Sequence, residues 1–415
     1  MSNFVNLNEK CLLKIVDYLK LEDQLNLWSA TKCIPKLQKV VSSSWQIRRQ
    51  HYLRRNTFKD KEILLQDFLQ CIGCTVEKFI FEDFPIDQLY AFRNHGFPNM
   101  RVLDYSNEDS DLVNDVKTLV NCFPLIETFK MGALIGGLSY EHHIARWKNL
   151  KRLDIMGSSK HWKTICFQEI CQKLQLQFLS VSWRESEEDA YVEAISKLQE
   201  LEELKLDLNL ISRENTIKLL NLPKLRKLCF EEFEDVQDFL DNIVEIRGKD
   251  VTGITWNENF WLWLNPNRFK NVQKVSIIDE GVVEGIWYAP IFNKSLSDFP
   301  QLLELCLANI NIWQTGDELW EMIYSCQQLK LLQLENFEME HEFFDFSFMS
   351  MDKALCQRRD PLVINFLNTY HKDLIFQHFI HSKLKIFINV SRESLSKFSG
   401  GVLELEFISN SKQEV

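Results

Sequence analysis

A six-residue pattern of apolar and polar positions recurs along most of this chain. It reads apolar–x–x–apolar–x–apolar, and successive copies begin 21 to 30 residues apart. The last two apolar positions are two residues apart, so a short strand turns both toward one face. Between the copies, apolar residues recur at helical spacing. The pattern therefore predicts alternating short strands and helices, with the apolar strand positions at Val76/Phe79/Phe81, Met100/Leu103/Tyr105, Ile126/Phe129/Met131, Leu150/Leu153/Ile155, Leu176/Leu179/Val181, Leu201/Leu204/Leu206, Leu225/Leu228/Phe230, Val251/Ile254/Trp256, Val272/Val275/Ile277, Leu302/Leu305/Leu307 and Leu329/Leu332/Leu334.

One strand and one helix of this size cannot bury their apolar faces alone, so successive units have to stack. A period of about 20–29 residues with this motif is typical of leucine-rich repeats. We therefore predict an α/β fold in which residues 76–345 form a curved solenoid of about eleven repeats. Its parallel strands are expected to line the concave side and its helices the convex side. The predicted helices contain the apolar stripes Leu112/Val116/Leu119, Tyr191/Ile195/Leu198, Val236/Phe239/Leu240 and Leu319/Met322/Ile323.

The two ends of the array depart from this period. Residues 51–75 are predicted to be a linker with a joining helix, whose apolar positions are Ile63, Leu64, Leu65, Phe68, Leu69 and Ile72. Residues 346–415 are predicted to be degenerate terminal repeats that cap the end of the core, as a solenoid requires. They contain three strand-like segments, at 362–366, 384–388 and 403–407.

The first 50 residues carry three short amphipathic helical segments. Pro35 opens the third segment, where its missing N–H costs nothing. A segment of fewer than about 40 residues rarely folds alone without a disulfide, a metal or a partner. We therefore expect this segment to complete its core against something else. Its helical stripes are Leu12/Ile15/Val16/Leu19, Leu25/Trp28 and Leu37/Val40/Val41.

This N-terminal segment resembles an F-box. The family pattern is an opening Leu-Pro and an acidic residue, then a Leu-Leu-x-Ile helix that ends in Tyr-Leu. A charged turn, a leucine-rich second helix and a late Trp follow. Asn8 stands where the family has proline, and asparagine is itself a good helix N-cap. Ala30, Thr31 and Lys32 replace the usual apolar–Cys step. The matching residues are Leu7, Glu9, Leu12, Leu13, Ile15, Tyr18, Leu19, Glu22, Asp23, Leu25, Leu27 and Trp45.

Together with the repeats, the resemblance implies a substrate receptor of a Skp–cullin–F-box ubiquitin ligase. The F-box would bind a Skp-type adaptor, and through it a cullin, while the repeats hold a protein target for ubiquitination and proteasomal degradation. Such a receptor is a non-catalytic subunit. The alternative is a non-catalytic leucine-rich-repeat scaffold whose N-terminal helices only cap the solenoid. On the first interpretation, the adaptor contacts are Leu7, Leu12, Ile15, Leu19 and Leu25.

Composition narrows the classes of function. The 415 residues are 45% hydrophobic and 26% charged, as in an ordinary folded protein. A net charge of −11 argues against a nucleic-acid or anionic-membrane surface, which needs clustered Lys and Arg. No apolar run approaches the roughly 20 residues of a membrane span, and the N-terminus lacks the pattern of a secretory signal. Eleven irregularly spaced cysteines indicate a reducing compartment, so we expect a cytoplasmic or nuclear protein.

No motif points to catalysis, a cofactor or a metal. Cys71 and Cys74 have metal-ligand spacing, but no second pair follows, so buried structural thiols are the favoured interpretation. The glycines within residues 132–137 lack the Lys-Ser/Thr of a phosphate-binding loop. The basic run from Arg48 to Lys61 is interpreted as a solvated helix between the F-box and the repeats.

Target recognition is expected on the concave side of the solenoid. The residue between the two inward strand positions faces this side. In the early repeats it is mostly charged, with alternating sign, and in the later repeats it is neutral. This pattern suits a protein or peptide held by several polar contacts, and plain soluble strand residues are an equal alternative. The charged candidates are Asp104, Lys130, Asp154 and Lys205.

A second candidate surface is an aromatic cluster where the repeat period is most irregular. Trp and Tyr are enriched at interface hot spots, because they bury a large area with few rotamers lost. Aromatic side chains also fill the core of an irregular repeat, which is the alternative. The candidate target contacts are Trp261, Trp263, Trp287 and Tyr288.

Overall fold

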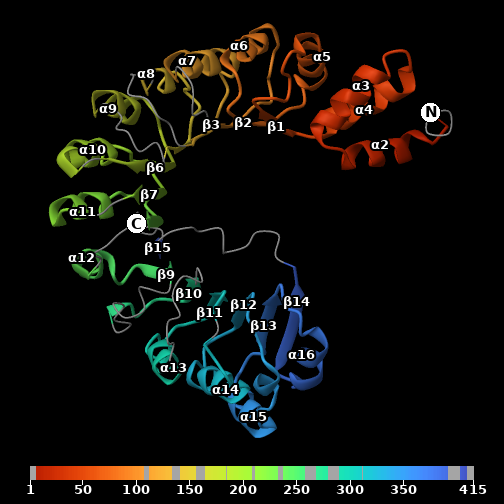
Figure 1. Ribbon diagram of the computed structural model, residues 1–415. Coiled ribbons are helices and arrows are strands. Elements are labelled where there is room, and N and C mark those ends of the chain that lie inside the picture. The colour runs from red at the N-terminus through yellow and green to blue at the C-terminus, as the bar shows by residue number, and fades with distance from the viewer. Residues whose placement is uncertain are drawn as a thin grey trace. The chain divides into compact units, whose positions relative to one another are not determined.

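The computed structural model describes residues 6–106, 112–132, 141–155, 164–183, 185–207, 211–231, 237–257, 268–278, 289–310, 312–390 and 402–408. The chain divides into two compact units, Met1–Leu201 and Glu202–Val415, which are called unit 1 and unit 2. Figure 1 labels their helices and strands.

Unit 1 begins with three helices, as the apolar stripes predict: α2 (Glu9–Tyr18), α3 (Leu21–Ala30) and α4 (Pro35–Ile47). The Asn8 side chain caps α2 by accepting a hydrogen bond from the Cys11 N–H at 2.8 Å. Pro35 is the first residue of α4. Strands and helices then alternate as β1 (Gln50–Arg54), α5 (Glu62–Ile72), β2 (Lys78–Glu82), α6 (Ile86–Leu89), η1 (Tyr90–Asn94), β3 (Val102–Ser106), α7 (Leu112–Cys122), β4 (Thr128–Met131), α8 (Glu141–Ile144), β5 (Arg152–Asp154), α9 (Thr164–Lys173), β6 (Phe178–Ser182), η2 (Glu185–Glu187) and α10 (Glu188–Ile195).

The strands of unit 1 lie side by side and parallel (Figure 1). The Phe129 ring of β4 lies 4.8 Å from that of Trp147, and the Tyr105 hydroxyl of β3 donates to Asp115 of α7. The inward residues therefore pack against the helical side, and the opposite face, called the open face below, carries the alternate residues. The second apolar position of each motif is buried and in register with the next, at Phe79, Leu103, Phe129, Leu153 and Leu179.

Unit 2 continues the alternation. Its elements are β7 (Glu203–Asp207), α11 (Arg213–Leu220), β8 (Lys227–Glu231), α12 (Gln237–Arg247), β9 (Val251–Asn257), β10 (Lys274–Ile278), α13 (Ala289–Ser297), β11 (Glu304–Ala308), α14 (Gly316–Ser325), β12 (Leu331–Glu335), η5 (His341–Phe344), α15 (Phe348–Cys356), β13 (Leu362–Leu367), α16 (Lys372–His378), β14 (Leu384–Asn389) and β15 (Val402–Phe407). The motif residues Ile254, Val275, Leu305 and Leu332 pair in register in parallel strands. The period, the strand–helix alternation and the parallel register confirm the predicted leucine-rich-repeat solenoid.

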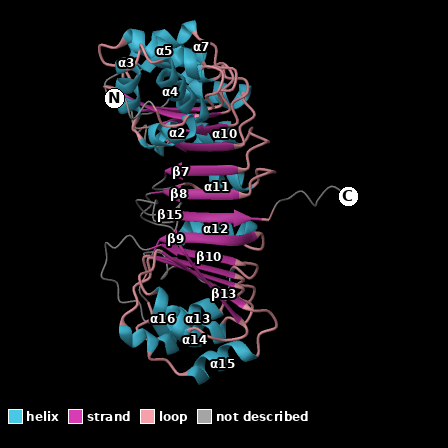
Figure 2. Ribbon diagram, turned by 90° about the vertical axis from the view of Figure 1, so that its right-hand side faces the viewer, coloured by secondary structure: helices cyan, strands magenta, loops and turns pink. Residues whose placement is uncertain are grey.

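The last predicted strand does not lie at the end of the array. β13 and β14 extend the parallel series, as predicted for terminal repeats. β15 instead lies between β8 and β9 and runs antiparallel to both (Figure 2). Leu405 pairs with Leu228 on one side and Ile254 on the other, so β15 contributes to the same buried columns as the repeats. The alternation of apolar and acidic residues predicts that this segment is a strand and which of its side chains are buried. It does not predict which strands lie beside it, because that depends on long-range pairing.

The basic run does not form the predicted helix. Gln50–Arg54 is strand β1, in which His51 and Leu53 are buried and Gln50, Tyr52 and Arg54 are exposed. Arg54 forms an ion pair with Glu82 of the neighbouring β2 at 2.9 Å. The helix prediction is wrong because the two-residue period of burial in this segment outweighs its charge.

His51 is buried where β1 meets α5 and β2. Its ring lies 5.1 Å from that of Phe68 and 6.2 Å from that of Phe79. Burial lowers the pKa of His51 to about 4; nearby backbone carbonyls at Arg48 and Trp45 oppose this shift, and the Arg48 charge adds to it. The imidazole is therefore neutral in the folded protein at neutral pH.

We expect unit 1 to lose stability in acid through His51. An unfolded histidine has a pKa of about 6.5, so between pH 6.5 and about 4 the unfolded chain binds a proton that the folded chain does not. The free energy of unfolding should fall by about 3 kcal/mol as the pH drops through this window. His51→Gln should remove this part of the pH dependence. Denaturant unfolding of both proteins at pH 7 and pH 4 measures it, and equal pH dependence in the two would contradict the assignment.

Candidate functional site

The N-terminal arm, residues 6–49, has a closed core. The buried Gln24 amide donates to the carbonyl oxygens of Val16 at 2.7 Å and Leu19 at 3.2 Å, which ties the end of α2 to α3. An ion pair between Lys39 and Glu9, at 3.1 Å, joins α4 to α2 on the surface. The core itself consists of Leu12, Val16, Leu25, Leu37, Val40, Val41 and Trp45.

Aromatic contacts fix the arm to the first repeat. The Trp45 ring lies 4.9 Å from Trp28 and 5.2 Å from Phe68 of α5. The Trp28 Nε1–H donates to the Asp67 carboxylate at 3.2 Å. The segment was expected to complete its core against something else, and α5 of the same chain is one such surface.

The five predicted adaptor contacts fall into two groups. Leu12 and Leu25 are 0% exposed, so in this conformation they support the arm and cannot touch a partner. Leu19 is half-buried, whereas Leu7 is 38% and Ile15 39% exposed. The surface available to an adaptor therefore includes Leu7, Ile15 and part of Leu19.

A second group of apolar residues lies on the outside of α2. Cys11, Ile15 and Tyr18 of α2 follow helical spacing, and Leu7 lies just before the N-cap Asn8. All four are exposed, Tyr18 to 92%. We call these four residues the outer stripe. Cys11 and Tyr18 are not among the predicted adaptor contacts, although their helical spacing with Ile15 is visible in the sequence. The neighbouring stripe around Leu12 has the same period, and the sequence alone does not say which of the two is buried.

Three predicted recognition residues are neighbours on the open face of unit 1. Asp104 pairs in register with Lys130, and Lys130 with Asp154. Burial raises the pKa of Asp104; the charges of Lys130 and Lys78 oppose this shift, and that of Asp154 adds to it. The row offers alternating charge to a ligand that follows the strands.

Lys205 belongs to unit 2, where it pairs in register with Cys229. Beyond Lys205, the sequence predicts neutral residues in this row. β15 changes that expectation, because its Glu404 pairs with Cys229 on one side and Thr255 on the other. Glu404 also forms an ion pair with Lys227 at 2.8 Å. The open face of unit 2 therefore includes a carboxylate from the end of the chain.

The aromatic candidates Trp261, Trp263, Trp287 and Tyr288 lie outside the described residues. Trp256, which begins the cluster in the sequence, is fully buried in β9 and pairs with Ile277 and Leu403. Trp256 therefore fills the core of the repeats and does not form part of an exposed surface.

Within the described ranges, no group of three or more His, Cys, Asp or Glu side chains is placed so that it could hold a metal ion. Cys71 is partly buried, and burial together with the Asp67 charge raises the pKa of its thiol. Cys74 is exposed, so the prediction of a buried thiol is wrong there. Among the residues that the structure describes, no helix is long and apolar enough to cross a membrane.

Comparison with known proteins gives similarities of structure only. No protein-family model matches the chain, and no curated protein matches it. The chain is similar to an internalin from Listeria monocytogenes, at 11% identity and a TM-score of 0.35, over 85% of this chain and 89% of that one. It is also similar to the leucine-rich repeat-containing protein LegL7 from Legionella pneumophila, at 13% identity and a TM-score of 0.37, over 76% and 90% of the two chains.

A third similarity is to TLR13 in its complex with ssRNA13, at 13% identity and a TM-score of 0.25, over 78% of this chain and 38% of that one. At these values the three similarities add no argument about function. The parallel strand register and the strand–helix alternation described above establish the leucine-rich-repeat fold.

Mutations on the two sides of α2 should differ in how much stability the arm loses. Leu12→Ala should destabilise the arm by about 2–5 kcal/mol, because it leaves a cavity in a closed core. Ile15→Ala should change stability by no more than about 0.5 kcal/mol, because Ile15 lies on the exposed side. Hydrogen exchange of the α2–α4 amides measures both, and similar losses of protection in the two variants would contradict the assigned faces.

The open-face row predicts a coupled titration. Lys130→Met should raise the pKa of Asp104 further, because it removes a positive charge that favours the carboxylate. A ¹³C NMR titration of the Asp carboxyl groups measures the shift. Lys148→Met, at an exposed lysine outside the row, is the matched control. An unchanged Asp104 titration in Lys130→Met would show that the two side chains do not interact.

Proposed function

We propose that the protein is the substrate-recognition subunit of a Skp–cullin–F-box ubiquitin ligase. The arm binds a Skp-type adaptor, and through it a cullin, while the repeats hold a protein target for ubiquitination and proteasomal degradation. The observation that carries this proposal is the outer stripe of α2. It leaves apolar side chains exposed on a segment that resembles an F-box, although the core of that segment is already buried within the arm and against α5.

The outer stripe has the chemistry of a binding surface. Burying an exposed Ile or Leu side chain is worth about 1.5–3 kcal/mol, and Tyr is enriched among the residues that dominate interface energies. Ile15 and Tyr18 are one helical turn apart and exposed, whereas the Trp45 and Phe68 rings that hold the arm to α5 are buried. An adaptor could therefore cover the stripe without separating the arm from the repeats.

The repeats supply the second half of the proposal. The row of Asp104, Lys130 and Asp154 presents polar groups along neighbouring strands, which suits an extended protein surface. The receptor performs no bond chemistry in this scheme. It contributes by proximity, because holding two reactants together removes part of the entropic barrier. On this proposal the protein acts in the cytoplasm or the nucleus.

The alternative, a leucine-rich-repeat scaffold without a ligase, has its own supporting observation. The arm is fixed to α5 by Trp28, Trp45 and Phe68, as a cap on the first repeat would be. A cap needs no partner, so the two candidates differ in whether the outer stripe binds an adaptor.

We expect the full chain to co-purify with a Skp-type adaptor as one complex, and Ile15→Asp to weaken it about 100-fold or more. The carboxylate would lose the apolar contact and remain buried without a partner. Co-expression followed by size-exclusion chromatography and calorimetry measures this. Ile63→Asp is the matched control, because Ile63 is 73% exposed on α5, away from the outer stripe.

A complex that survives Ile15→Asp would show that the outer stripe is not the interface. A monodisperse wild-type chain that binds no adaptor would favour the scaffold.

A further inference from the structure

An extra strand separates two neighbouring repeats in unit 2. β7 and β8 pair directly, as do successive strands from β9 to β14. Between β8 and β9, which run in the same direction, β15 is inserted antiparallel to both (Figure 2). The edges of β8 and β9 thus form a slot that accepts a strand from outside the repeat order.

The apolar side of β15 matches the repeat core. Leu403 pairs with Phe230 and Trp256, and Leu405 with Leu228 and Ile254. Both leucines are fully buried, and Phe407 is nearly so. The slot therefore selects apolar residues at every second position of its occupant.

The other side of β15 is acidic and meets lysines of the slot. Glu404 binds Lys227 at 2.8 Å, and Glu406 binds Lys274 at 3.0 Å. Burial disfavours the charged Lys274, yet the bond to Glu406 and the nearby carboxylates raise its pKa above the usual value. Gly253 leaves room for this contact, because a Cβ there would lie 2.6 Å from a Glu406 carboxylate oxygen.

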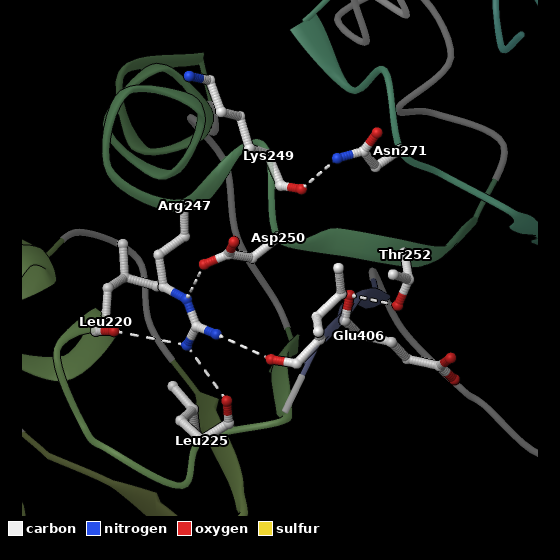
Figure 3. Close-up of polar contacts among 9 residues, drawn as sticks. Leu220, Leu225, Arg247, Lys249, Asp250, Thr252, Asn271 and Glu406 are labelled. Carbon is white, nitrogen blue, oxygen red and sulfur yellow. Dashed lines mark hydrogen bonds and ion pairs between the residues drawn. The ribbon is translucent and has the colours of Figure 1, made fainter. Parts of the chain in front are cut away.

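Arg247 contacts the end of β15 and also binds Leu220, Leu225 and Asp250 (Figure 3). Its guanidinium lies 4.2 Å from the centre of the Phe407 ring and donates to the Ile408 carbonyl at 3.5 Å. The same group donates to the Leu225 carbonyl at 3.1 Å and pairs with Asp250 at 3.2 Å. Arg247 therefore contacts both the slot wall and the last described residues of the occupant.

The occupant comes from outside the repeat order. β15 is the next described strand after β14 in the sequence, yet β14 is six strand positions away from it in the order of unit 2. β15 therefore enters the slot from the far end of that strand order and not from a neighbouring repeat.

We propose that the slot between β8 and β9 is a binding site for an extended peptide that alternates apolar and acidic residues. β15 occupies this site as an intramolecular competitor of such a segment in a partner protein. The main-chain edges of two strands provide affinity, as in other cases of strand addition, and Lys227, Lys274 and Arg247 provide selectivity. This inference is independent of adaptor binding by the arm.

The test uses the full chain and a fluorescent peptide with the sequence of residues 402–408. In the variant Glu404→Lys/Glu406→Lys, the tethered strand places positive charges beside Lys227 and Lys274 and is weakened. The peptide should bind this variant at least tenfold more tightly than it binds the wild type. A second peptide with Lys at both Glu positions should bind the variant at least tenfold more weakly than the first.

Glu338→Lys/Glu340→Lys is the matched control, because these two exposed glutamates have the same spacing and lie outside the slot. It should leave the peptide affinity at the wild-type value. Equal binding of the two peptides to the Glu404→Lys/Glu406→Lys variant, or no binding of either, would overturn the proposal.

Hydrogen exchange on the unmodified chain gives a measurement that does not depend on the folding of any variant. The amides of β15 should exchange at least tenfold faster than those of β10 and β11, because an exchangeable occupant opens more often than the repeats themselves. Protection of β15 equal to that of β10 and β11 would mean that the strand is a permanent part of the sheet and would refute the competitor role.

Discussion

Each repeat in this chain depends on its neighbours to bury the two inward residues of its strand. Leu103 and Tyr105 show the rule: the residues before and after them in register are also buried, and the helical side closes over them. A strand without a neighbour would leave apolar columns and backbone groups open to water. Unit 1 meets this demand at its start with β1 and the arm, whose Trp45 reaches the Phe68 ring behind the strands.

Buried arginines meet a related demand in unit 2. The last carbonyl groups of a helix have no partner within it. Arg358, which is buried, donates to the carbonyl oxygens of Ile323 at 3.0 Å and Cys326 at 3.3 Å, at the end of α14. Arg247 likewise donates to the carbonyl oxygens of Leu220, the last residue of α11, and Leu225, and it also donates to that of Ile408. A guanidinium has five N–H donors, so one side chain can satisfy several such carbonyls and hold consecutive repeats together.

The sequence predicts what is periodic and misses what is not. Residues such as Leu153 and Leu305 lie in the predicted strands because their motif repeats many times, and each copy supports the same register. β1 is a single short strand inside a basic run, so its two buried residues make a weak signal. The outer stripe of α2 and the stripe of Leu12 share one period, and only the packing of α4 against α2 distinguishes them. The position of β15 depends on pairing across more than 150 residues of sequence, as in the Thr252–Glu406 contact, and no local pattern carries that information.

β15 belongs to two candidate recognition features of unit 2, the open-face row that contains Lys205 and the slot between β8 and β9. Glu404 lies in the same open-face row as Lys205 and Cys229, between Cys229 and Thr255. While β15 is in place, this row contains a carboxylate that is held by Lys227. If β15 leaves, the carboxylate is lost from the row and the edges of β8 and β9 become available. On the proposed exchange, loss of β15 would change the charge of this row and open the slot together, so a ligand that binds one of the two states more tightly would shift the population toward it.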